Sequence, residues 1–259
     1  MALRNHIGFI LVLGEFFMSA PPVTSQTALQ TFQYQDYQKN ILSLWWEAKE
    51  VRLRQLEQYK AALVQDPRNT TLVLAMGVLL TCLAVPESEK SSPYTDQAVG
   101  LIQEYLDQNP GNMVALAYFC TARSLVLRNN GNILEQVFQM GPILDAVDRA
   151  VASRSGQQDE WLVRLVRANL FIKLPDLLGK KDVAYRDFRF IVQARTQYPE
   201  IEMALPTTYY YLARIEQSRG NNQAARDFRM RAKEKAEALN QTSTEEYRAL
   251  LGSNLHASR

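Results

Sequence analysis

Two short stretches, Asp66-Pro67-Arg68-Asn69 and Asn109-Pro110-Gly111-Asn112, each end one apolar helical segment and begin another. Tyr198-Pro199 stands at a similar junction further along the chain. Proline cannot continue a helix, and the residue before it disfavours helical backbone, so each stretch marks a helix boundary. Helix pairs that recur in this way are typical of an α-helical solenoid, in which each pair packs against its neighbours.

The apolar residues between these boundaries recur with helical spacing, and no stretch alternates as a strand does, so an all-α chain is expected. An N-terminal block over 34–64, bent near Asn40, precedes four helix pairs, and a short helix over 244–251 ends the chain. The expected pairs are 71–85 with 95–108, 113–128 with 133–153, 159–174 with 181–198, and 207–219 with 222–239. Polar residues that can accept hydrogen bonds from a first helical turn are the expected N-caps: Thr70, Asn112, Asp159 and Thr244.

Small residues recur where paired helices are expected to cross. With Pro67 as the closing proline of one pair, Gly77 falls at the crossing position of the next first helix. The last pair fits this register best, with the large Leu212 followed by the small residues Ala213, Gly220, Ala225 and Ala232. From about residue 41 to 240 the chain therefore resembles a tetratricopeptide repeat protein. Its spacing departs from the 34-residue motif, because Pro67 and Pro110 are 43 residues apart. The resemblance implies a right-handed α-α superhelix and identifies no particular protein.

Four segments are expected along the chain: a signal peptide over 1–25, a helical block over 26–65, a tetratricopeptide-like domain over 66–240, and a capping helix with a tail over 241–259. The first segment has a basic residue, an apolar run and small residues ahead of Gln26, which is the pattern of a secretory signal. An uncleaved anchor is the alternative, although the run is short for a bilayer. We expect an exported protein, periplasmic or secreted and bacterial, with no stable membrane insertion once the signal is removed.

Charge and cysteine content limit the partners. The net charge is only +2, which gives no electrostatic basis for binding nucleic acid. The balance is uneven, since residues 28–110 carry seven basic and ten acidic groups and residues 149–195 carry ten basic and five acidic. Cys82 and Cys120 lie in apolar runs and at different depths along neighbouring helices, so two buried free thiols are expected.

Catalytic signatures are missing from the sequence. There is no phosphate-binding glycine loop, no GxSxG, HExxH or CxxC motif, and no dinucleotide fingerprint. Of the two histidines, one lies in the signal segment and the other is His256 near the C-terminus, so neither a histidine metal site nor a catalytic triad can be assembled. We expect no enzyme, no cofactor and no metal.

A groove along the first helices of the pairs is the leading candidate for binding. The tetratricopeptide register places Tyr210 toward it, followed by Arg214 and Gln217 at helical spacing, and assigns Tyr209 to packing. Four further residues of this candidate site come from the other first helices: Val78, Thr121, Val166 and Asn169. With one Asn, one Arg and no Lys, this lining departs from the carboxylate clamp of some tetratricopeptide proteins. Its mixed character would suit an amphipathic helix or peptide, or the protein's own N-terminal block.

A basic surface is the second candidate, formed by Arg164, Arg167, Lys180, Lys181 and Arg189. It would suit an anionic partner. The interpretation we favour is a solvated face that pairs with nearby acids: Asp159, Glu160, Asp182 and Asp187.

Two classes of function remain open. The first is a non-catalytic scaffold that mediates protein–protein interaction, with another protein or peptide held in the groove. The alternative is an accessory protein of a periplasmic solute transport system, in which the groove holds a small apolar ligand.

Overall fold

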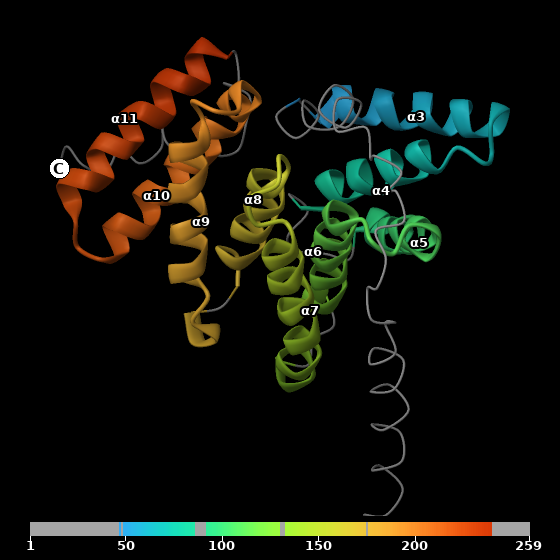
Figure 1. The fold of residues 1–259 in the computed structure, drawn as a ribbon, viewed down its shortest axis with the longest axis horizontal. Coiled ribbons are helices and arrows are strands. Elements are labelled where there is room, and N and C mark those ends of the chain that lie inside the picture. Colours follow the sequence, from blue (N-terminus) through green and yellow to red (C-terminus); the bar gives the residue numbers. More distant parts are fainter. Residues whose placement is uncertain (1–46, 48, 86–91, 130–132, 175, 240–259) are drawn as a thin grey trace, which may run out of the picture. The chain divides into compact units, whose positions relative to one another are not determined.

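The structure, a computed structural model, describes residues 47, 49–85, 92–129, 133–174 and 176–239, all within one compact unit, Phe32–Arg259. Every regular element among them is helical (Figure 1), which confirms the all-α prediction for this part of the chain. The expected signal peptide over 1–25, the start of the N-terminal block and the capping helix over 244–251 lie outside the described residues.

The helices follow one another in pairs. A single helix, α3 (Lys49–Gln65), comes first, and each later pair packs together: α4 (Thr70–Ala84) with α5 (Pro93–Gln108), α6 (Met113–Asn129) with α7 (Ile133–Ser153), α8 (Glu160–Phe171) with α9 (Lys181–Ala194), and α10 (Leu205–Ser218) with α11 (Asn222–Ala238). Contacts between pairs join each element to its neighbours, and α6 touches both α4 and α8. The four predicted pairs are thus present, with boundaries within about four residues of those expected.

Two short 3-10 helices were not predicted, and both lie in the connections between expected helices. The first, η2 (Asp176–Leu178), follows α8, which ends at Phe171 and not at Leu174. The second, η3 (Pro199–Ala204), lies between α9 and α10. Tyr198 is extended, as a residue before proline prefers, so α9 stops short of it. Pro206 lies in the first turn of α10, where a missing backbone N–H costs nothing.

Side-chain caps fix several helix starts. Asn69, not the predicted Thr70, caps α4: its side chain accepts a hydrogen bond from the backbone of Leu72 at 3.1 Å. Asn112 caps α6 as predicted and accepts from Ala115 at 3.0 Å. Asp159 stands at the start of α8 but makes no capping bond, because its carboxylate pairs with Arg154. Charge pairing therefore replaces capping at that position.

The crossing of α4 and α5 depends on Gly77. A Cβ at this position would lie 2.6 Å from the Cγ1 of Ile102, which is fully buried, so any side chain would force the helices apart. The other predicted crossing residues, Ala213, Ala225 and Ala232, are buried as expected. Gly220, with φ of +80°, forms the turn between α10 and α11, where other residues would be strained.

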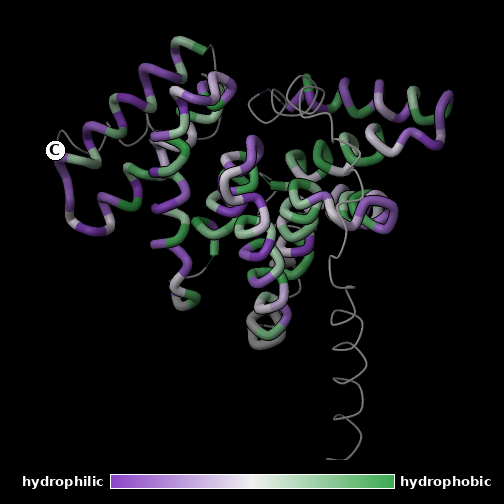
Figure 2. Tube along the Cα trace, in the orientation of Figure 1, coloured by the Kyte–Doolittle hydropathy of each residue, from purple (hydrophilic) through white to green (hydrophobic). Residues whose placement is uncertain are grey.

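The core changes in character along the chain (Figure 2). Helix α4 has no charged residue and is buried over most of its surface, whereas α9 and α11 alternate apolar and hydrophilic residues. Cys82 and Cys120 are free and buried, as predicted, and burial raises the pKa of each thiol to about 12. Both thiols are therefore uncharged at neutral pH.

Candidate binding surfaces

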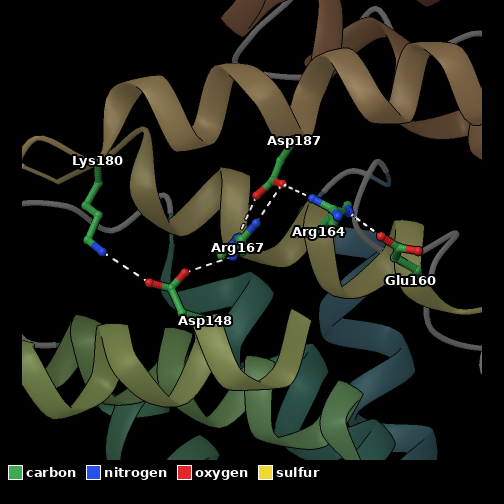
Figure 3. Close-up of polar contacts among 6 residues, drawn as sticks. All are labelled: Asp148, Glu160, Arg164, Arg167, Lys180 and Asp187. Carbon is green, nitrogen blue, oxygen red and sulfur yellow. Dashed lines mark hydrogen bonds and ion pairs between the residues drawn. The ribbon is translucent and has the colours of Figure 1, made fainter. Parts of the chain in front are cut away.

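A group of ion pairs joins three consecutive helices, α7, α8 and α9 (Figure 3). We call it the Asp187 cluster; its members are Asp148, Glu160, Arg164, Arg167, Lys180 and Asp187. The Asp187 carboxylate is fully buried and accepts two hydrogen bonds from Arg167, at 2.7 and 2.8 Å, and one from Arg164 at 2.8 Å. A bidentate arginine plus a second arginine is among the strongest pairing geometries available to a carboxylate.

The cluster extends outward from Asp187 on both sides. Arg164 also donates to Glu160 at 2.7 Å, and Arg167 donates to Asp148 at 2.8 Å. Lys180 reaches the other oxygen of Asp148 at 3.2 Å. Burial alone would lower the pKa of Arg167, but the hydrogen bonds and charges of Asp187 and Asp148 outweigh it and raise that pKa. Arg167 is therefore charged although it is buried.

Aromatic rings cover the cations of the Asp187 cluster. The Arg164 guanidinium lies 4.5 Å from the centre of the Phe190 ring, and the Lys180 ammonium lies 5.0 Å from that of Phe171. The three cations equal the three carboxylates in number, and all are paired. The cluster therefore has no free charge with which to hold an anionic ligand, and its role is to hold α7, α8 and α9 together.

This arrangement revises the predicted basic surface. The pairing of Arg164 and Arg167 with Glu160 and Asp187 is present. Arg167, Glu160 and Asp187 are buried, however, and only Arg164 is partly exposed to solvent. The remaining basic residues lie apart from the cluster's centre: Lys181 pairs with the exposed Asp176 at 2.5 Å, and Arg189 is exposed. The five residues do not form one surface open to a partner.

A second polar group surrounds Glu216 of α10, which is almost fully buried. Asn221 donates to its carboxylate at 2.6 Å, Tyr185 of α9 donates a further hydrogen bond, and Arg219 lies 3.8 Å away. Desolvation would raise the pKa of Glu216, but the hydrogen bonds from Tyr185 and Asn221 and the charges of Arg219 and Arg189 hold it below its usual value. Arg219 also covers the Tyr185 ring at 4.1 Å and pairs with Asp182. The group fastens the turn between α10 and α11 onto α9.

The three consecutive tyrosines of α10 have different surroundings. Tyr209 is buried, stacks on Phe228 with ring centres 6.0 Å apart, and accepts a hydrogen bond from Arg195 at 3.0 Å. Tyr211 is buried against Phe188. Tyr210 is only partly buried, which agrees with the predicted division between packing by Tyr209 and exposure of Tyr210.

Tyr210 belongs to an accessible strip of side chains. The exposed Arg214 lies over its ring at 5.9 Å, and the exposed Gln217 follows one turn later. Arg229 of α11 donates a hydrogen bond to the Gln217 side-chain oxygen. We call these four residues, Tyr210, Arg214, Gln217 and Arg229, the Tyr210 face.

The other predicted groove residues are not accessible. Val78, Thr121 and Val166 have exposed fractions of 0%, 8% and 3%, and the Thr121 hydroxyl is bound to the Ala117 carbonyl at 3.2 Å. Asn169 is partly buried. The residues of the predicted site therefore differ in solvent exposure. Those of α10 are at least partly exposed, whereas those of α4, α6 and α8 are buried or partly buried.

The sequence did not single out Asp148 or Glu216, and it placed Asp187 on a solvated face although the structure buries this side chain. A signal was present for two of them. Asp187 interrupts a buried helical stripe that includes Ala184, Phe188 and Ile191, and Glu216 follows the buried Leu212 and Ala213 at helical spacing. An acid on an apolar stripe must be paired when buried, and cations at helical spacing on a neighbouring helix are the expected partners.

Comparisons with known proteins found no match: no family model, no curated protein and no solved structure resembles the chain. Within the described ranges, no helix is long and apolar enough to cross a membrane. The same residues contain no group of three or more His, Cys, Asp or Glu side chains placed to hold a metal ion.

Proposed function

We propose that this protein is a non-catalytic scaffold, built as a tetratricopeptide-like right-handed superhelix, that binds another protein through the Tyr210 face. The observation that carries the proposal is the strip formed by Tyr210, Arg214 and Gln217, which is accessible although it lies on a helix otherwise buried on most sides. The pattern of residues 1–25 supports export as the setting, periplasmic or secreted.

The chemistry of this strip suits recognition of a protein. Tyrosine and arginine are enriched among the residues that dominate binding free energy at interfaces, because each combines a large contact area with directed hydrogen bonds. Here the guanidinium of Arg214 lies 5.9 Å from the centre of the Tyr210 ring, so the two side chains can contact a partner together. The buried charged groups of the Asp187 cluster are paired internally, which supports a structural role for them and not a catalytic one.

The test is capture of the native partner by wild type and by a Tyr210→Ala, Arg214→Ala double variant. The double variant is expected to lose about 2 kcal/mol or more of binding free energy, the scale of an interface hot spot, as measured by calorimetry with the purified partner. Its circular dichroism and melting temperature should change little, because neither side chain is fully buried.

Arg226→Ala is the matched control, because Arg226 is an exposed arginine that bonds only to Gln223 in the described structure and lies outside the Tyr210 face. It should bind the partner as wild type does. Equal capture by all three proteins would refute the proposed binding face, and loss of folding in the double variant would show that Tyr210 is required for packing.

A further inference from the structure

We infer that the segment bound at the Tyr210 face is an acidic stretch of the partner protein, whose carboxylates pair with Arg214 and Arg229. This inference rests on the proposed function and adds the chemistry of the ligand to it. Its basis is a difference among the arginine side chains: acids neutralise some guanidinium groups and not others.

Four arginines of the C-terminal half that join helices or turns already have a carboxylate. Arg154 pairs with Asp159, Arg164 with Glu160 and Asp187, Arg167 with Asp187 and Asp148, and Arg219 with Asp182. Arg195 is an exception, since it donates to the hydroxyl of the buried Tyr209 at 3.0 Å.

Arg214 and Arg229 differ from that pattern. Arg214 rests on the face of the Tyr210 ring, and Arg229 donates to the neutral side-chain oxygen of Gln217. Across the described residues, no ion pair joins either guanidinium to an acid. Arg214 of α10 and Arg229 of α11 are therefore brought to one face by Gln217, and their described contacts are with an aromatic ring and an amide oxygen.

A carboxylate from the partner would bind the guanidinium groups of Arg214 and Arg229 more strongly than the Tyr210 ring and the Gln217 oxygen do. A carboxylate adds the attraction of opposite charges to its hydrogen bonds with a guanidinium, and it can bind the guanidinium through two parallel bonds. Gln217 is exposed and can rotate away, so an incoming carboxylate can take its place on Arg229. The accessible part of the Tyr210 ring would meanwhile contact an apolar or aromatic side chain between the acids.

The full-length protein is first used to select binding peptides from a random displayed library. Each selected peptide is then compared in solution with a version that lacks its carboxylates. Each selected peptide is resynthesised with every Asp replaced by Asn and every Glu by Gln, and fluorescence anisotropy measures both affinities. Acidic residues should be enriched, and the amide version should bind at least about tenfold more weakly. Affinity for the acidic version should also fall with added salt.

Arg214→Gln with Arg229→Gln should abolish the difference between the acidic and amide peptides, whereas Arg226→Gln should retain it. Peptides that need Tyr210 but bind equally as acids and amides would overturn the inference and leave the proposed function standing. Selection of no peptide that depends on Tyr210 would contradict both. Equal competition by a single-stranded oligonucleotide would identify phosphate as the preferred anion and also overturn the inference.

Discussion

Helix pairs α4–α5 and α8–α9 each consist of two consecutive α-helices, but different interactions hold the two pairs together. The first pair meets at Gly77, where a missing side chain lets a charge-free helix approach Ile102. The second meets through Asp187, Arg164 and Arg167, a buried charged contact. The comparison teaches that one helix-pair architecture tolerates two kinds of interface, and that each has its own weakness. The apolar pair is sensitive to volume, and the charged pair is sensitive to the loss of one partner.

The largest effect should come from Asp187→Ala. The change leaves two arginine side chains close together without their shared carboxylate, and breaking a buried pair from one side costs about 3–5 kcal/mol. Urea unfolding followed by circular dichroism measures this loss.

Two controls sharpen that result. Asp148→Ala removes a more exposed acid, whose side chain is 37% accessible, and should cost about 1 kcal/mol or less. Replacing Asp187, Arg164 and Arg167 together by apolar residues of similar size should recover part of the stability, because the buried charges at the centre are removed together. Asp148 keeps its pairing with Lys180, and Glu160 keeps the hydrogen bond from the Gly156 backbone N–H. A triple variant as unstable as Asp187→Ala would show that packing, and not charge pairing, determines this interface.

Gly77→Leu should have the next largest effect, about 1–3 kcal/mol, because the new side chain overlaps Ile102 and must displace α5. Cys82 of α4 lies within one and a half turns of Gly77 and reports the loosening: its buried thiol should react faster with a thiol reagent in the variant than in wild type. Urea unfolding gives the free energy.

Gly100→Ala is the matched control for that change. Gly100 lies on α5, and a Cβ added there would have no neighbouring atom within 4 Å, so alanine should be neutral or slightly stabilising through its higher helix propensity. Equal stability of wild type and Gly77→Leu would refute the close crossing of α4 and α5.

The smallest effect should come from Glu216→Gln, on the order of 1 kcal/mol at pH 7, because the amide keeps part of the hydrogen bonding to Tyr185 and Asn221. The pKa of Glu216 is lower in the folded state than its usual value of 4.5, so its contribution is present above that value and is lost as pH falls through the folded pKa. Melting temperatures between pH 7 and pH 3 should therefore fall less steeply in Glu216→Gln than in wild type. Glu104→Gln, an exposed acid of α5, should follow the wild-type curve.

Helix positions were predicted well because they depend on local signals. The start of α6 at Met113 and of α11 at Asn222 agreed with expectation, since a cap or a turn residue marks each within a few positions. The ends of α8 and α9 were less well predicted, because each helix passes into turns three or four residues before its expected end and the apolar pattern continues through those turns. The candidate site stays a prediction, and its residues differ in accessibility: Tyr210, Arg214 and Gln217 are at least partly exposed, whereas Val78, Thr121 and Val166 are buried.

The sequence by itself determined that this chain is helical, where its helices break, and that its two thiols are buried, because periodicity, proline and glycine act over a few residues. Only the tertiary structure decided which charges neutralise one another. Asp148, Arg167 and Asp187 are about twenty residues apart in sequence, and their pairing depends on the rotation of three helices about their axes. The same packing decides which residues of a helical strip stay accessible, since a neighbouring helix covers Val78 and Val166 but leaves Arg214 exposed.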